Sequence, residues 1–212
     1  MSSHARQPAR REFVTGPAGR IECAVDAAQG EARGVALVAH PHPLFGGSLD
    51  NKVAQTLARS LAELGYVAWR PNFRGVGASE GSHDEGRGEV ADLAAVLAHA
   101  RTVSSRSDSV VLAGFSFGAA MQTLLAQQLI NEGRAATRLV LVGLAVTNYT
   151  LPKVPADTIL IHGERDETIP LAAVLDWARP QELPVIVLPG ADHFFHGRLN
   201  LLRAIIRQNW QA

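Results

Sequence analysis

Short runs of Val, Leu and Ile alternate along this chain with longer segments that carry apolar residues at helical spacing. The runs are bounded by Gly and Pro, and most are almost continuously apolar, as in parallel strands covered on both faces. This alternation constrains the fold more than any other feature, because repeated strand and helix units build a sheet layered between helices. The predicted strands are Gly34–Ala39, Tyr66–Arg70, Ser109–Gly114, Arg138–Gly143, Thr158–His162 and Pro184–Leu188.

The segments between these runs are predicted to be helices. In the first of them, Val53, Leu57, Leu61 and Leu64 lie on one side of a helix that Gly65 ends. An antiparallel hairpin is expected before the first parallel strand. With right-handed crossovers, the order of elements predicts one doubly wound α/β domain. The hairpin covers Glu12–Asp26, and the helices are Asn51–Leu64, Glu89–Val103, Phe117–Asn131, Leu171–Trp177 and Arg198–Trp210.

We expect a single domain over residues 12–212, preceded by a flexible tail over residues 1–11. Hydrophobic residues make up 47% of the 212-residue chain, enough for a sizeable core. The tail contains several Arg and no acidic residue, so a short organelle transit peptide is the alternative interpretation. It lacks the apolar segment of a secretory signal, and the single cysteine, Cys23, cannot form an internal disulfide. A cytoplasmic location is therefore expected.

The balance of charge argues against polyanionic partners. Twenty Lys and Arg residues offset twenty Asp and Glu residues, so no global field attracts nucleic acid or an anionic membrane surface. The longest apolar stretch, Leu139–Val146, is far shorter than the ~20 residues that span a bilayer. We expect neither nucleic acid nor membrane as a partner, and a monomer or weak homodimer in solution.

The motif Gly114-Phe115-Ser116-Phe117-Gly118 follows a predicted strand and opens a predicted helix. This is the G-x-S-x-G nucleophile elbow in the context that it requires, with small residues where a tight turn leaves no room for side chains. The serine hydroxyl would project at a helix N-terminus, where backbone N–H groups stabilise a developing oxyanion. Ser116 is therefore the candidate nucleophile, and an ordinary Gly-rich turn is the alternative.

A serine hydroxyl needs a base, and the base needs an orienting group. Asp166 follows the predicted strand Thr158–His162, and His193 follows the predicted strand Pro184–Leu188. Nucleophile, acid and base thus run in the order of the doubly wound hydrolases. Each lies just beyond the carboxyl end of a strand, where such sheets bind their ligands.

Neighbouring residues compete for two of these roles. Glu164 and Glu167 flank Asp166 and could orient the base instead. Asp192, beside the candidate base, is a third rival carboxylate. Asp166 is preferred because its shorter side chain stands in the middle of its loop. His196 is the rival base, and we expect it at the start of the last helix as a loop or capping residue.

The loop His40–Gly47 (HPHPLFGG) is expected to supply an oxyanion donor beside the Phe117 N–H. Its two prolines have no N–H, so the donor is the backbone of His42, Leu44 or Phe45. We prefer Leu44 or His42, without separating the two. The prolines would hold the path of the loop rigid, which preorganised donors require.

Two loops have alternative interpretations as ligand sites. His40 and His42 could chelate a metal, but no Cys or carboxylate cluster lies nearby in sequence, so we expect no metal and no cofactor. The glycine-rich loop Pro71–Gly81 lacks a Walker lysine and dinucleotide spacing. It is predicted to be a structural turn that walls the site, with Arg74 tying loops together, and a phosphate site is the alternative.

These residues resemble the α/β-hydrolase superfamily over nearly the whole chain. The resemblance implies a mostly parallel, eight-stranded sheet without a lid domain, serine ester hydrolysis, and the triad and oxyanion hole described above. Four motifs resemble those of a compact, lidless bacterial branch near the dienelactone hydrolases: His40–Gly47, Asn51–Val53, Asn72–Gly77 and Asp192–Phe195. The dienelactone hydrolases themselves use a cysteine nucleophile where this chain has serine, so the resemblance does not imply lactone specificity.

The expected reaction is cleavage of small or short-chain carboxylic esters through an acyl-enzyme on Ser116. Only the short segment Leu144–Asp157 lies where members of the superfamily insert bulky lids, so we expect an open site. The alternatives are a thioesterase, peptidase or acyltransferase on the same triad, and a non-catalytic small-molecule-binding protein. Candidate apolar walls of the substrate pocket are Leu44, Phe45, Phe117, Val146 and Phe194.

Overall fold

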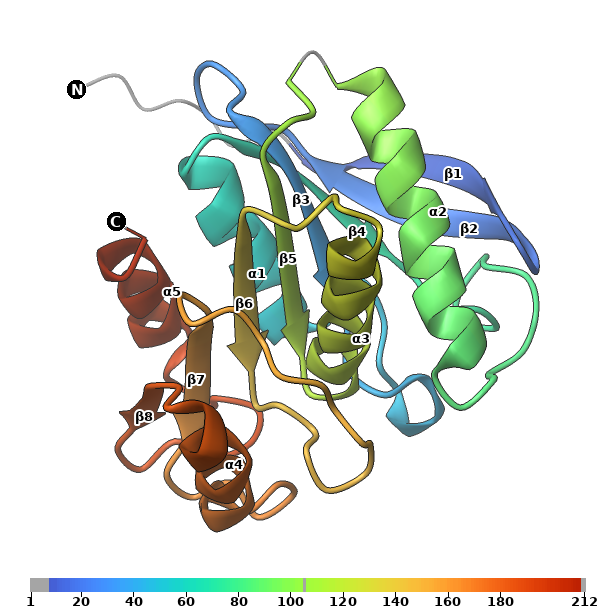
Figure 1. The fold of residues 1–212 in the computed structure, drawn as a ribbon. Helices are drawn as coiled ribbons and strands as arrows, with labels where there is room; N and C mark the ends of the chain where they lie inside the picture. The colour runs from blue at the N-terminus through green and yellow to red at the C-terminus, as the bar shows by residue number, and fades with distance from the viewer. Residues whose placement is uncertain (1–7, 105, 211–212) are drawn as a thin grey trace.

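The computed structural model describes residues 8–104 and 106–210 (Figure 1). After an initial run of three strands, α-helices separate all but one pair of successive strands in these residues. The strands are β1 (Arg10–Gly16), β2 (Gly19–Asp26), β3 (Gly34–Ala39), β4 (Tyr66–Pro71), β5 (Val110–Phe115), β6 (Arg138–Val142), β7 (Ile159–Gly163) and β8 (Val185–Leu188). The α-helices are α1 (Lys52–Glu63), α2 (Arg87–Val103), α3 (Phe117–Asn131), α4 (Leu171–Ala178) and α5 (Leu199–Gln208). Every element predicted from the sequence is present, with each end within about two residues of its predicted place.

The N-terminal boundary differs slightly from the prediction. Strand β1 begins at Arg10, two residues before the predicted start of the domain, because Arg10 and Arg11 pair with Val25 and Ala24 of β2. Of the predicted tail, residues 1–7 lie outside the described residues.

The strands form one eight-stranded sheet in the order β1-β2-β4-β3-β5-β6-β7-β8. Strands β3 to β8 pair in parallel, and β1 and β2 add antiparallel pairs at one edge. The chain moves outward from β3 to β4 and then returns to β5 on the other side of β3. The loops that follow β3 and β5 therefore diverge at a topological switch point, where open α/β sheets bind their ligands.

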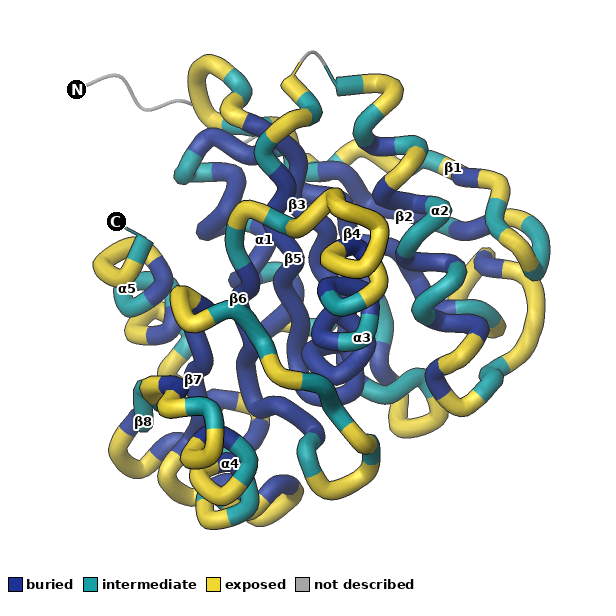
Figure 2. Tube along the Cα trace, in the orientation of Figure 1, coloured by how far each residue is buried: buried dark blue, intermediate teal, exposed yellow. Residues whose placement is uncertain are grey.

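The core has two halves, one on each face of the sheet. Helices α2, α3 and α4 cover one face, and α1 and α5 cover the other (Figure 1). Side chains alternate along each strand, so Leu37 packs on the first face and Val38 on the second. Figure 2 shows the central strands buried along their length. Burial on both faces is the reason that these strands are apolar at nearly every position.

The connection between β6 and β7 is short and irregular. Residues 143–158 contain neither a helix nor a strand, so this domain has no lid, as predicted. Within the described part of the chain, no helix has the length and apolar composition that crossing a membrane requires.

Candidate active site

Ser116 stands between β5 and α3 with a positive backbone φ (φ 56°, ψ −117°), which L-residues rarely adopt. A Cβ on Gly114 would lie 2.5 Å from the backbone of the first turn of α3. A Cβ on Gly118 would lie 2.4 Å from the carbonyl oxygens at the end of β3. Both glycines are therefore required by close packing, as the G-x-S-x-G motif predicts. The turn holds the serine in a strained conformation of the kind that clusters at functional sites.

Ser116, His193 and Asp166 form a hydrogen-bonded row. His193 Nε2 lies 3.1 Å from Ser116 Oγ, and His193 Nδ1 lies 2.7 Å from Asp166 Oδ2. A carboxylate can only accept, so we assign the ring proton to Nδ1, which leaves the Nε2 lone pair to accept from the serine hydroxyl. All three residues are buried. The row has the geometry of a nucleophile, a general base and an orienting acid.

The loop after β7 holds Asp166 firmly in this position. Asp166 Oδ1 accepts hydrogen bonds from the backbone N–H groups of Thr168 and Ile169, at 2.9 and 2.8 Å. Because Oδ1 is committed to the backbone, Oδ2 is turned toward the imidazole. Of the rival carboxylates in this loop, Glu167 is exposed, and Glu164 accepts a hydrogen bond from the Gly190 N–H in the loop after β8.

His196 does not occupy the position of the base. Its side chain is exposed, and its Nδ1 lies 2.6 Å from Asp192 Oδ2, so these two predicted rivals pair with each other. His196 is a loop residue next to the last helix, as expected, and it does not cap that helix. Helix α5 begins at Leu199, with Arg198 as its N-cap residue, and His196 lies in the preceding turn.

The loops that carry Asp166 and His193 are joined by their backbones. The N–H groups of Glu164 and Arg165 donate to the carbonyls of Leu188 and Ala191, at 3.0 and 2.9 Å. A Cβ on Gly163 would lie 2.6 Å from the Ala191 carbonyl oxygen, so only glycine permits this approach. The sequence pattern does not single out Gly163, although a glycine directly after a buried strand is a signal of close backbone packing.

The HPHPLFGG loop contains a single 3₁₀ turn, Pro43–Phe45. Within it, the Leu44 N–H donates to His42 Nδ1 at 3.3 Å, and the Phe45 N–H donates to the His42 carbonyl at 3.1 Å. The ring of His42 lies 4.8 Å from the ring of Phe117, so this loop borders the nucleophile elbow. Among the described contacts, the His42 N–H is the one of the three candidate donors that has no protein acceptor.

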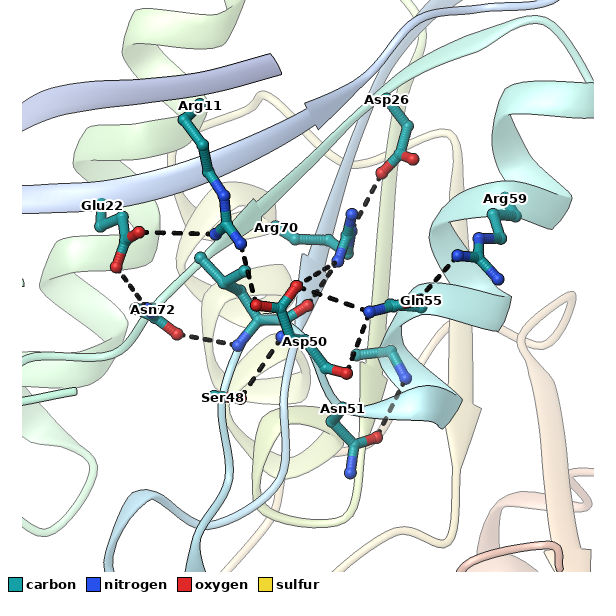
Figure 3. Close-up of polar contacts among 12 residues, drawn as sticks. Arg11, Glu22, Asp26, Ser48, Asp50, Asn51, Gln55, Arg59, Arg70 and Asn72 are labelled. Atoms are coloured by element: carbon teal, nitrogen blue, oxygen red, sulfur yellow. Dashed lines mark hydrogen bonds and ion pairs between the residues drawn. The ribbon is translucent and has the colours of Figure 1, made fainter. Parts of the chain in front are cut away.

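The segment that directly follows the HPHPLFGG loop is anchored at Leu49 by buried polar groups (Figure 3). Asn72 Oδ1 accepts the Leu49 N–H at 2.8 Å, and Arg70 donates to the Leu49 carbonyl. Arg70 Nε also donates to Asp26 at 2.9 Å, and Asn72 Nδ2 donates to Glu22 at 2.8 Å. The N–H and the carbonyl of Leu49 are thus both held by side chains from β4 and the residue after it. This anchoring keeps the loop in place beside Ser116.

His40 is a structural residue. Its Nδ1–H donates to the Pro41 carbonyl at 2.6 Å, and its Nε2 accepts the Phe73 N–H at 3.0 Å. An imidazole with both nitrogens engaged has no lone pair left for a metal, so the chelate with His42 has no structural support. In residues 8–104 and 106–210, no group of three or more His, Cys, Asp or Glu residues could hold a metal ion.

Burial lowers the pKa of His40 to about 4, and this shift predicts a loss of stability in mild acid. Between pH 6.5 and pH 4 the histidine of the unfolded chain takes up a proton that the folded protein excludes, so the free energy of unfolding falls as the pH falls. At pH 4.5 this linkage costs about 2 to 3 kcal/mol. Urea unfolding of the wild type and of His40→Gln at pH 7.5 and 4.5 measures it.

We expect a smaller difference between the two pH values in His40→Gln than in the wild type. Some dependence remains in the variant, because burial also lowers the pKa values of His42 and His162. Equal pH dependence in the two proteins would contradict the assignment to His40.

Arg74 ties the glycine-rich loop to α2. Its Nε and Nη2 bind the Asp92 carboxylate at 2.7 and 2.8 Å, and Nη2 also donates to the Gly88 carbonyl at 2.8 Å. These contacts are those of the predicted structural turn. With its guanidinium engaged inside the protein, Arg74 gives no support to the phosphate alternative.

The apolar residues predicted as pocket walls fall into two groups. Phe117 is buried and Val146 is half-buried. Leu44, Phe45 and Phe194 expose 68%, 86% and 48% of their surface and lie on the loops that carry the site. These three residues, here called the apolar rim, cannot enclose a ligand by themselves.

Comparison with known proteins identifies a family and close structural relatives. Residues 26–141 match the family model described as X-Pro dipeptidyl-peptidase (S15 family). An uncharacterized protein from Rickettsia prowazekii is 34% identical over 192 residues, which cover 86% of this chain and 81% of that protein. The matched family segment contains Ser116 and the HPHPLFGG loop but ends before Asp166 and His193.

Two solved structures are similar over almost their entire length. An alpha-beta serine hydrolase homologue from Coxiella burnetii is 36% identical with a TM-score of 0.87, and the match covers 97% of this chain and 99% of that chain. A protein from Xanthomonas campestris, described as a member of a/b serine hydrolase without lid, is 32% identical with a TM-score of 0.87. That match covers 98% of this chain and 96% of the other.

Proposed function

This chain belongs to the α/β-hydrolase superfamily and to the S15 family within it, and on that premise we propose that it hydrolyses small or short-chain carboxylic esters through an acyl-enzyme. The observation that carries the proposal is the buried hydrogen-bonded row of Ser116, His193 and Asp166. A histidine that accepts from a serine and donates to a carboxylate has the protonation state that general-base catalysis requires.

In the first step, Ser116 Oγ attacks the acyl carbonyl while His193 Nε2 takes the hydroxyl proton. Asp166 holds the imidazole in its Nδ1–H tautomer and stabilises the imidazolium that forms. The tetrahedral intermediate then collapses, the bond to the leaving oxygen breaks, and His193 gives its proton to the leaving alcohol. Water attacks the acyl-enzyme with the same base, which releases the carboxylic acid and restores the Ser116 hydroxyl.

Two backbone donors are proposed to hold the oxyanion. Phe117 is the first residue of α3, so its N–H has no acceptor within the helix and faces developing negative charge at the helix N-terminus. The second donor in this proposal is the His42 N–H, because the N–H groups of Leu44 and Phe45 already donate to His42. Each such donor contributes on the order of 10²–10³ in turnover in serine hydrolases.

The open site predicts that activity does not increase with the length of the acyl chain. Burying each CH₂ group would contribute about 0.8 kcal/mol, but the exposed apolar rim offers no enclosed surface for a long chain. We expect kcat/KM for short-chain p-nitrophenyl esters to exceed that for emulsified long-chain lipids, without activation at an interface. A strong preference for emulsified long-chain lipid would contradict the proposed substrate class.

A peptidase is the second candidate function, because the family model that matches the chain is described as an X-Pro dipeptidyl-peptidase. The two reactions share the nucleophile and differ in the leaving group, which is an amine in the peptidase. Initial rates on a panel of short-chain esters, thioesters and X-Pro amides distinguish them. Higher kcat/KM on the amide than on the esters would replace the ester proposal with the peptidase.

The alternative that this chain is a non-catalytic binding protein can be tested with a fluorophosphonate probe. Such a probe reacts with an activated serine, whatever the leaving group of the natural substrate. We expect the folded wild type to be labelled at Ser116. A folded protein that is not labelled would favour the binding protein.

A further inference from the structure

A second histidine lies beside the carboxylate of Asp166. His162 is in β7, directly before the loop that carries the acid, and its side chain is completely buried. Its Nε2 lies 2.9 Å from the Ile169 carbonyl oxygen and 3.4 Å from Asp166 Oδ2, the same oxygen that accepts from His193. The proposed chemistry assigns no role to this imidazole.

The contacts of His162 define its protonation state. The Ile169 carbonyl can only accept, so Nε2 carries the ring proton and donates it to this carbonyl. The same nitrogen lies 3.4 Å from Asp166 Oδ2, close enough for an electrostatic contact. Nδ1 is buried and has no hydrogen-bond partner among the described residues. A protonated ring would leave a second buried N–H unpaired, which is costly in an apolar environment.

Among the groups around His162, the one charged neighbour in the described contacts is Asp166. Asp166 lies on the following loop, and the imidazole of His193 approaches from the loop after β8. In the sheet, His162 lies in register with Val187 of β8, which is apolar. Burial lowers the pKa of His162, so the ring is neutral when the base works near neutral pH.

We propose that His162 is a positioning residue for the catalytic carboxylate, an inference that rests on the proposed function. Ile169 is held from both sides, since its N–H donates to Asp166 Oδ1 and its carbonyl accepts from His162. The imidazole thereby closes the loop around Asp166 and keeps the partial positive charge of its Nε2–H group 3.4 Å from Oδ2. Because the ring is uncharged, it orients the carboxylate without neutralising the negative charge that stabilises the His193 imidazolium.

Two variants separate this role from simple packing. His162→Leu has a similar volume but no N–H, and His162→Gln keeps an uncharged N–H donor. The readout is the rate of fluorophosphonate labelling of Ser116 between pH 5 and 9, with the folded fraction measured by thermal unfolding. His162→Phe is a further donor-free variant that serves if His162→Leu does not fold.

We expect the donor-free variant to be labelled roughly 10- to 100-fold more slowly, since a misplacement of about 1 Å in an active site costs up to about 10²-fold. The acidic limb of its pH profile should move to lower pH, because a displaced carboxylate stabilises the imidazolium less. His162→Gln should stay within a few-fold of the wild type with an unchanged profile.

The inference is overturned if the folded donor-free variant keeps the wild-type rate and profile, or if both variants lose labelling only in proportion to their unfolded fraction. A wild-type protein that is not labelled at any pH would instead overturn the proposed function, so the two failures are distinguishable.

Discussion

Ser116→Ala is expected to lower turnover of the best ester substrate by about 10⁶-fold while the protein stays folded. The substitution removes the oxygen that would form the acyl-enzyme, and in the described part of the chain Ser116 is the one hydroxyl hydrogen-bonded to His193. The fold should survive because Ser116 Oγ does not cap α3, and the backbone bond from Ala120 N–H to the residue 116 carbonyl is kept. Initial rates and thermal unfolding of the two proteins measure both effects.

Ser109→Ala is a matched control just before the opposite end of the same strand. Its hydroxyl contacts Tyr66 and Thr137, far from the carboxyl end of the sheet where the site lies. We expect its kcat/KM to equal that of the wild type. If Ser116→Ala keeps more than a few per cent of the activity in a folded protein, the acyl-enzyme mechanism is wrong.

Asp166→Asn should lower kcat by about 10⁴-fold, although it changes almost no volume. The backbone N–H groups of Thr168 and Ile169 donate to Oδ1, so an asparagine would keep its oxygen there and turn its NH₂ group toward His193. An NH₂ group can only donate, which forces the imidazole proton from Nδ1 to Nε2. The Nε2 lone pair is then lost, and the base cannot take the proton of Ser116.

The rival carboxylates supply the controls for this prediction. Glu164→Gln keeps an acceptor for the Gly190 N–H, and Asp192→Asn changes a residue that pairs with the exposed His196. Both variants should remain within a few-fold of wild-type kcat. If either lost as much activity as Asp166→Asn, or if Asp166→Asn stayed near the wild type, Asp166 would not be the group that orients His193.

Prediction from the sequence succeeds where the signal is local. Helix α3 begins at Phe117 and ends at Asn131, the predicted bounds, because an elbow with glycine at both ends admits only one place for the helix to start. The start of strand β1 and the partner of His196 have no such local signal. The first depends on pairing with β2 and the second is the ion pair with Asp192, and neither contact has a pattern along the chain.

Supporting residues of the site are the hardest to find in the sequence. Arg70 lies near the end of β4 and Asn72 directly follows that strand, yet they hold both backbone groups of Leu49, more than twenty positions earlier in the chain. A charged residue at the end of an otherwise apolar strand is a weak signal of such a role. Only the packed structure shows which backbone groups it serves.

Periodicity and motif order by themselves determined the layered sheet and the three loops that carry Ser116, Asp166 and His193. They do so because helix and strand repeats are local, and because parallel strands bring their carboxyl ends to one edge. Tertiary structure alone decided which carboxylate faces the imidazole and that His162 lies beside Asp166. It also decided which of the three candidate N–H donors, those of His42, Leu44 and Phe45, has no acceptor among the described contacts. These features are distances between loops, and His193 and Ser116 meet across 77 positions of chain, a separation that carries no information about their distance in space.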